Sequence, residues 1–276
     1  TVFIECRSAY LSGVSDAFGP VGETAYVSAM AKIAARNPQQ AQIGGIVAHA
    51  DLRNPDLDTV LDLHEQVGGG LFKGIRHAGA CDPHPEDLAI PGRGDVGMYL
   101  DPKFQHGVAR LGERGLSYDT WHYHHQNRDF LALAKAVPNT KMVLDHFGAP
   151  LGVGRFAGKR AEIFAAWKDD VAAIAECPNV VAKLGGMAMP DNGYGWHERD
   201  KPPSSDEFVE TQAQWYHHMI ACFGPERCMF ESNFPVDRAS ISYGVLWNGL
   251  KKIAAQYSEA DQNRMFAGTA RAIYRL

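Results

Sequence analysis

Short apolar runs rich in β-branched residues alternate along the chain with longer stretches in which apolar positions recur at the period of a helix. This pattern predicts repeated strand–helix units that build a parallel sheet. The expected strands are Val2–Cys6, Ile43–His49, Leu71–His77, Leu116–Tyr123, Lys141–His146, Val180–Leu184 and Arg227–Phe230. The expected helices are Glu23–Arg36, Leu57–Val67, Pro102–Arg114, Asp129–Val137, Arg160–Glu176, Glu207–Phe223, Ile241–Gln256 and Ala260–Tyr274.

Repeated units of this kind favour a (β/α)8 TIM barrel, an α/β fold that closes with eight strands. The pattern supplies seven strands, and the chain opens inside an apolar run without an initiator Met. We therefore expect a single barrel domain over residues 1–276 that is incomplete at its N-terminus and lacks its first strand. A doubly wound open sheet is the competing fold, but no GxGxxG motif or Walker-type loop follows an early strand.

Composition narrows the class of protein. The chain has 276 residues, 45% of them hydrophobic, which is enough for one large core. Its net charge of -5 offers no basic surplus for nucleic acid, and no apolar run approaches the roughly 20 residues that span a membrane. Five cysteines without a CxxC pair argue against a disulfide scaffold or structural zinc. We expect reduced thiols, a cytoplasmic location and a small-molecule substrate. A homodimer is the expected assembly, since paired subunits are the commonest oligomers.

Polar residues gather where the predicted strands end. In a parallel barrel these ends meet in one mouth, so residues far apart in sequence can share a substrate. His146 lies at a strand-to-loop turn and is a candidate for catalysis or metal ligation. Glu231 and Asp237 follow the last strand, and either carboxylate can activate water or serve only in structure. Asp145 directly precedes His146, so strand alternation predicts that it faces the other way and is structural.

Further candidates lie at the remaining strand ends. Arg76 can clamp a substrate carboxylate with two parallel hydrogen bonds or can form structural ion pairs. The other predicted substrate-binding residues are His77, Trp121, His124 and Lys183. His122 and His125 are expected to take no part in catalysis or binding. A solvated loop is the alternative explanation for the whole histidine cluster that follows Trp121. Trp196 is expected to be a wall or core residue, and His197–Asp200 a solvated charge run.

Several of these segments resemble the amidohydrolase superfamily, in the amidohydrolase-related group that includes sugar-acid lactonases, the pyrone dicarboxylate lactonase and ring-carboxylate decarboxylases. The resemblance is carried by Thr1–Arg7, Gly74–His77, Val143–Gly148, Lys183–Gly186 and Cys228–Asp237. Two positions depart from the family pattern. The His-x-His pair that usually ends the first strand is absent, and Asn233 stands where the family has a metal-binding or water-activating Asp.

The resemblance implies a hydrolase that opens a small carboxylate-bearing lactone or ester. His146 would polarise the carbonyl, Asp237 or Glu231 would orient water, and Asn233 would donate to the oxyanion. No cofactor is favoured; the alternative is one divalent cation, Zn or Mn, with His146 and His124 as ligands. Two other functions stay open: a metal-dependent non-oxidative decarboxylase of an aromatic or enolic acid, and a degenerate barrel that binds a ligand without turnover.

Overall fold

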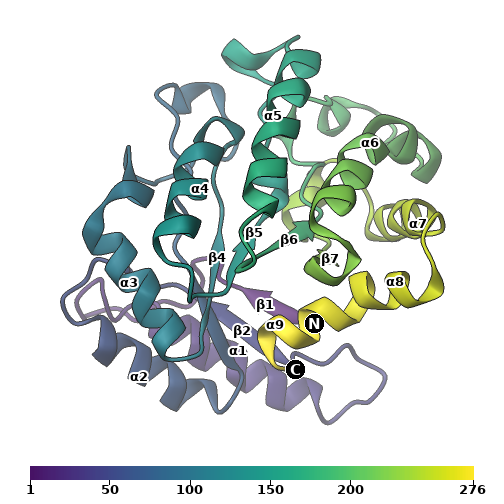
Figure 1. Cartoon of the computed structure of the whole chain (residues 1–276). Coiled ribbons are helices and arrows are strands. Elements are labelled where there is room, and N and C mark those ends of the chain that lie inside the picture. Colours follow the sequence, from purple (N-terminus) through teal and green to yellow (C-terminus); the bar gives the residue numbers. More distant parts are fainter.

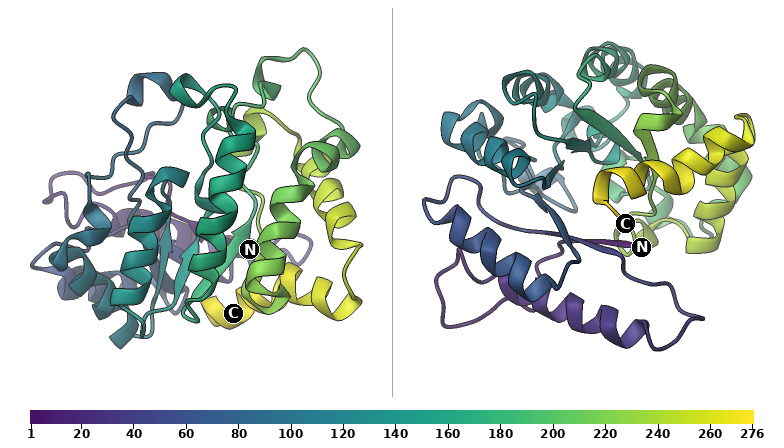
Figure 2. Two further views of the ribbon diagram at one scale, coloured as in Figure 1. Left: turned by 45° about the horizontal axis from the view of Figure 1, so that its top comes forward. Right: turned by 60° about the horizontal axis from the view of Figure 1, so that its bottom comes forward.

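The protein folds around a single curled sheet of parallel strands, which is ringed on its outer side by helices (Figures 1 and 2). The structure is a computed structural model that describes residues 1–276. Each strand pairs with the next in chain order. The strands are β1 Val2–Ile4, β2 Gly45–Ala48, β3 Phe72–Arg76, β4 Ser117–Thr120, β5 Met142–Leu144, β6 Val180–Leu184 and β7 Cys228–Phe230. All seven predicted strands and their parallel order are confirmed.

Helices follow the strands as expected from the helical period. They are α1 Val21–Ala34, α2 Leu57–Gly68, α3 Pro102–Glu113, α4 Asn127–Ala136, α5 Arg160–Ala175, α6 Ser205–Phe223, α7 Tyr243–Ala254, α8 Glu259–Asn263 and α9 Thr269–Tyr274. The last predicted helix is divided, because a π-helical turn over Arg264–Gly268 separates α8 from α9. This wider turn carries Phe266, whose ring packs on Phe230 with 4.7 Å between centroids.

Strand alternation divides the apolar residues into two layers. On β5, Met142 and Leu144 face the helices in the main core, whereas Val143 faces the inside of the curled sheet. The inner layer is small and is closed from below by α9, which crosses the end of the sheet beside both chain termini (Figure 2). Its members are Val47, Val143, Val181, Met229 and Tyr274.

The sheet is open between β7 and β1, since its hydrogen-bonded order runs from β1 to β7 without joining its ends. The curvature and the parallel order are those of a TIM-barrel-like α/β fold. Closure by an eighth strand stays a prediction, as does the single-domain description. No helix has both the length and the apolar character that a membrane crossing requires.

Candidate active site

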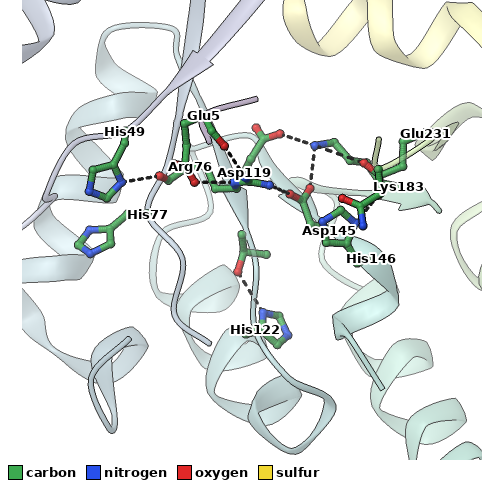
Figure 3. A network of polar contacts seen from close by, with 12 residues as sticks. Glu5, His49, Arg76, His77, Asp119, His122, Asp145, His146, Lys183 and Glu231 are labelled. Carbon is green, nitrogen blue, oxygen red and sulfur yellow. Dashed lines mark hydrogen bonds and ion pairs between the residues drawn. The ribbon is translucent and has the colours of Figure 1, made fainter. Parts of the chain in front are cut away.

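Charged side chains from six strands meet inside the curled sheet, above the inner apolar layer (Figure 3). Alternation along the strands places them there. Lys183 follows Val181 by two residues on β6 and so shares its inward direction. The other members are Glu5 after β1, Arg76 on β3, Asp119 on β4, Asp145 and His146 after β5, and Glu231 after β7.

The ammonium group of Lys183 lies at the centre of this network. Its Nζ is 2.9 Å from Asp119 Oδ2, 2.8 Å from Asp145 Oδ1 and 3.9 Å from Glu231 Oε2. Burial alone would lower the pKa of Lys183, but Asp145 and the neighbouring acidic groups outweigh it and hold that pKa well above its usual value. Lys183 is therefore a permanent cation, 5% exposed, in the interior of the protein.

Asp119 is fixed from two further sides. Ser117 Oγ donates to its Oδ1 at 3.0 Å, and the hydroxyl of Tyr274 donates to its Oδ2 at 2.5 Å. Tyr274 belongs to α9, so the floor of the sheet is hydrogen-bonded to the charged network above it. Asp119, Glu5 and Tyr274 were not among the residues singled out from the sequence.

Arg76 is held by the protein itself. Its Nε donates to Glu5 Oε1 at 3.0 Å, one terminal nitrogen donates to the Glu5 carbonyl at 2.7 Å, and the other lies 3.5 Å from Asp145 Oδ2. These contacts are the structural ion pairs that the sequence left open. A bidentate clamp on a substrate stays a prediction, and it requires Arg76 to exchange these partners for the substrate.

His146 and Glu231 form a close pair at the opening of the network. His146 Nδ1 lies 2.6 Å from Glu231 Oε1, and the Nε2 atom of the ring has no hydrogen-bond partner in the chain. The backbone of His146 is left-handed, with φ of 52°. Two glycines make room for this pair: a Cβ on Gly186 would lie 2.4 Å from His146 Nδ1, and one on Gly185 would lie 2.5 Å from Glu231 Cγ.

The charges of this pair support each other. Burial lowers the pKa of His146, but the carboxylate of Glu231 outweighs that effect and raises it above its ordinary value. Burial conversely opposes ionisation of Glu231, yet His146 and Lys183 lower its pKa to about 2. At neutral pH Glu231 is therefore a stable anion that favours the protonated form of the imidazole, and it is a weak base.

Asp237 is the more suitable base. Burial raises its pKa to about 7, although Asn233, a backbone amide and the charge of His146 all act to lower it. Asn233 Nδ2 donates to Asp237 Oδ1 at 2.7 Å, and the Ala188 amide donates to Oδ2 at 3.3 Å. Asn233 has a left-handed backbone with φ of 51°. A carboxyl group with this pKa exchanges a proton near neutral pH, as a general base must.

Asp145 faces the opposite way from the sequence prediction. The prediction that it faces away from the site is wrong, because its carboxylate contacts both Lys183 and Arg76 inside the network (Figure 3). Asp145 lies two residues after the inward-facing Val143 and so faces the inside of the sheet. The positive φ of His146 and Phe147 then turns His146 towards the same cluster, although alternation would point it outward, and the prediction had taken His146 as the inward position. Period-two alternation holds only for extended backbone.

The remaining histidines lie apart from the network. His77 Nδ1 accepts from the Leu52 amide at 3.2 Å, and Figure 3 shows its ring beside His49, away from the guanidinium of Arg76. His122 is fully buried and bonds to Thr120 Oγ1 at 3.0 Å. The solvated-loop expectation is therefore wrong for this residue, because the chain turns inward after β4.

Two other predicted substrate-binding residues also have contacts away from Lys183. His124 Nδ1 accepts from the Leu151 amide at 3.2 Å, and its ring packs on Phe156. Trp121 is half-buried, and its carbonyl accepts from the amides of Gly79 and Ala80. Of the predicted substrate-binding set, Arg76 and Lys183 belong to the charged network.

The donor set does not fit a catalytic zinc or manganese ion as it stands. Such a site uses about three His, Cys or carboxylate ligands around one point. The chain contains no group of three or more such residues arranged to hold a metal. Asp119 and Asp145 converge on the ammonium of Lys183, and the Nδ1 atom of His146 is engaged by Glu231. The positive charge among these carboxylates is therefore supplied by the side chain of Lys183.

Comparison with known proteins identifies the class of this fold and site. Residues 10–276 match the Amidohydro_2 family model, described as amidohydrolase. The chain belongs to this amidohydrolase family. The y4mH protein of Sinorhizobium fredii is 31% identical over 271 residues, which cover 98% of this chain and 80% of that protein.

Two further relatives come from Burkholderia multivorans. A protein named L-fucono-1,5-lactonase is 27% identical over 239 residues, covering 86% of this chain and 73% of its own length. A crystal structure of an amidohydrolase with bound zinc superposes with a TM-score of 0.73 at 26% identity, covering 92% of this chain and 79% of that one. The family resemblance expected from the strand ends is thus confirmed.

Proposed function

We propose that this amidohydrolase opens a small lactone or ester that carries a carboxylate. The observation that supports the proposal most directly is the presence of two different groups: the imidazole of His146, whose protonated form is favoured by Glu231 at 2.6 Å, and the separate carboxyl group of Asp237, whose pKa is about 7. Hydrolysis of an ester needs one group that donates a proton and one that accepts it. The relative from Burkholderia multivorans whose name specifies L-fucono-1,5-lactone supports a sugar-acid lactone as the substrate type.

The proposed reaction begins with the substrate carbonyl accepting a hydrogen bond from His146 Nε2. Asp237 takes a proton from water, and the water oxygen forms a bond to the carbonyl carbon. The negative charge that develops on the carbonyl oxygen is stabilised by the imidazolium. The ring C–O bond then breaks, the leaving oxygen takes the proton from Asp237, and the product is an open hydroxy acid. Asn233 holds the reacting carboxyl in place through the 2.7 Å hydrogen bond.

We further propose that this reaction proceeds without a divalent metal. The proposal rests on the donor set, because Lys183 supplies the positive charge among Asp119, Asp145 and Glu231. The decarboxylase alternative requires a metal, so the same donor set disfavours it. The ligand-binding alternative draws on Asn233, but Asp237 lies four residues further along the chain and offers a carboxyl group suited to proton transfer.

A pH-indicator assay with a panel of sugar-acid lactones and pyrone carboxylates tests the function. We expect acid release well above the spontaneous rate, and a loss of roughly 10²- to 10⁴-fold in His146→Phe and Asp237→Asn. Glu162→Gln, on the exposed side of α5, is the matched control and should keep full activity. Folded protein that hydrolyses no member of the panel would refute the proposal.

Chelation tests the proposal on metal. The purified enzyme should keep its rate after treatment with a chelator, and added zinc or manganese should not raise it. A rate that falls on chelation and returns with either ion would overturn the metal-free reaction. Release of carbon dioxide from an aromatic acid by the metal-loaded protein would instead establish the decarboxylase.

A further inference from the structure

The chain has a pocket at the rim of the sheet whose lining includes none of His146, Glu231 and Asp237. It encloses about 450 Å³ between the loop after β6 and the segment that leads from β7 into α7. Trp196, which is buried, and the half-buried Phe234 contribute apolar surface, and Tyr243 stands beside Phe234 with 5.2 Å between ring centroids. Aromatic walls of this kind favour a ligand with a ring or a compact carbon skeleton.

The charged residues that line this pocket are all basic. Arg199, Arg238 and His197 face it, and no Asp or Glu lines it, although the chain as a whole carries a net charge of -5. Arg199 is partly neutralised by Glu207 at 2.6 Å. Arg238, in contrast, takes part in no ion pair and no side-chain hydrogen bond. The pocket therefore contains an exposed guanidinium whose hydrogen-bond donors are free.

The start of α7 adds to the positive potential. This twelve-residue helix begins at Tyr243, and its preceding residue Ser242 also lines the pocket. The side chain of Ser242 accepts a hydrogen bond from the Val245 amide. The earlier amides of the first turn have no intrahelical acceptor, as at the start of any helix. Such a helix end favours an anion, and here it reinforces Arg238 in the same cavity.

We propose that this pocket binds the carboxylate of a small ring-bearing acid, with Arg238 as its principal anchor. The proposal rests on the proposed function and deepens it by naming the group that positions the substrate. Arg76, the anchor expected from the sequence, is engaged by Glu5, whereas Arg238 is free. Arg238 adjoins Asp237 and Phe234 adjoins Asn233, so the loop that holds the proposed base also forms the pocket.

Equilibrium binding of isophthalate tests this pocket without any turnover, since this ring dicarboxylate has no bond to hydrolyse. We expect calorimetry to show binding to the wild-type protein, a loss of about tenfold in Arg238→Met, and little binding of the neutral isophthalamide. Affinity should fall as salt is raised. Arg271→Met, an exposed arginine on α9 outside the pocket, should bind as the wild type does.

The kinetic counterpart uses a lactone that the enzyme hydrolyses. Arg238→Met should raise KM about tenfold and leave kcat within a few-fold, because the lost contact exists before and during the reaction. Unchanged isophthalate affinity in Arg238→Met, or no isophthalate binding by the wild type, would overturn the proposal that this pocket binds a carboxylate through Arg238. If isophthalate binds through Arg238 but no lactone is opened, the pocket stands and the proposed function falls.

Discussion

Two charged regions of this protein differ in how their cations are partnered. Lys183 lies inside the sheet, where Asp119 and Asp145 are each within 3 Å of its ammonium and the group is sealed from solvent. Arg238 lies at the rim and has no acidic partner. A buried ion pair whose carboxylates are fully desolvated is costly to break, whereas an exposed one contributes little to stability. The interior charges therefore fix geometry, and the rim charge is available to a ligand.

His146, Glu231 and Asp237 combine features of both regions: His146 and Asp237 are buried like Lys183, and Glu231 is partly exposed. Glu231 is 15% exposed and its carboxylate reaches towards Lys183, so it connects the sealed network with the opening. Its pairing with His146 is fixed, but Asp237 can gain or lose a proton near neutral pH. Proton transfer is thus expected at Asp237, which can change its charge, next to the fixed charges of His146 and Glu231.

The largest expected effect comes from removing the interior cation. Lys183→Met leaves Asp119 buried without its counter-ion and Asp145 with only Arg76 at 3.5 Å, and we expect the free energy of unfolding to fall by about 3–5 kcal/mol. Activity should fall with it, because Glu231 loses one of the charges that stabilise its anion. Denaturant titration measures the change. Lys251→Met, on the exposed face of α7, is the control and should differ from wild type by less than about 0.5 kcal/mol.

A near-normal unfolding free energy in Lys183→Met would contradict the claim that the buried carboxylates depend on the Lys183 cation. It would mean that the carboxylates are protonated or hydrated in the folded protein and need no fixed cation. The pKa of Asp145 is already raised by burial, against the effect of Lys183, so this is the residue at which such an outcome would show.

Gly186→Ala tests the close fit around His146. The new Cβ would lie 2.4 Å from the imidazole, at a residue with φ of 78°, so the pair with Glu231 must move apart. We expect kcat/KM to fall by more than about tenfold and the pKa of His146 to return towards its ordinary range. Gly158→Ala is a matched control, because its φ of 74° imposes the same backbone strain while no atom lies within 4 Å of the new Cβ.

If both glycine variants lose activity equally, backbone strain and not the position of His146 would explain the loss. Nuclear magnetic resonance titration of the imidazole separates the two causes. Only a displaced ring should show a lowered pKa, since the raised value depends on the 2.6 Å contact with Glu231.

The strand periodicity made the fold and the general place of the site predictable. Six of the seven runs contribute residues to the charged network, and His146 and Glu231 were found because His146 ends one run and Glu231 directly follows another. Asp145 was placed wrongly because the positive φ that turns His146 inward beside it is not visible in a hydrophobic pattern. Tyr274 gave no signal either, since it reaches Asp119 across 155 positions of the chain.

Roles at the rim were harder to predict, because they depend on which charges find partners. The sequence offered Arg76 as a carboxylate clamp, and only the folded chain shows that Glu5 engages it. Arg199 was read as part of a solvated charge run, and its neighbour in space, Arg238, was not singled out. Which surface charges form ion pairs depends on their distances in the folded chain. Neither the composition nor the hydrophobic period of the sequence contains those distances.

Asp237 should give the protein a measurable pH dependence of stability. Its pKa is about 7 in the folded state and about 4 in an unfolded chain, so between these values only the folded protein keeps the proton. The contribution is fully present below about pH 4 and is lost as pH rises through about 7, with a slope of up to about 1.4 kcal/mol per pH unit. Asp237→Asn should remove this slope, as measured by denaturant titration across the window.

Glu231 should affect stability in the opposite pH direction from Asp237. Its folded pKa of about 2 lies below the unfolded value, so its contribution is present above about pH 4 and is lost as pH falls towards 2. The wild-type and Asp237→Asn curves should therefore differ between about pH 4 and 7 and run parallel below that window. Curves that stay parallel throughout would show that Asp237 titrates as an ordinary carboxyl group.

The smallest expected effect is at the rim, where Glu207→Gln frees Arg199 from its 2.6 Å ion pair. Both side chains are substantially exposed, at 45% and 37%, so unfolding free energy should change by less than about 1 kcal/mol. Isophthalate affinity should nevertheless rise by roughly two- to fivefold at low salt, because the pocket gains a second free guanidinium. Asp206→Asn makes the same change in net charge on the same helix, at an ion pair with Lys252 outside the pocket. Equal gains in both variants would mean that long-range charge alone attracts the ligand, and a gain confined to Glu207→Gln would place Arg199 beside Arg238 at the bound carboxylate.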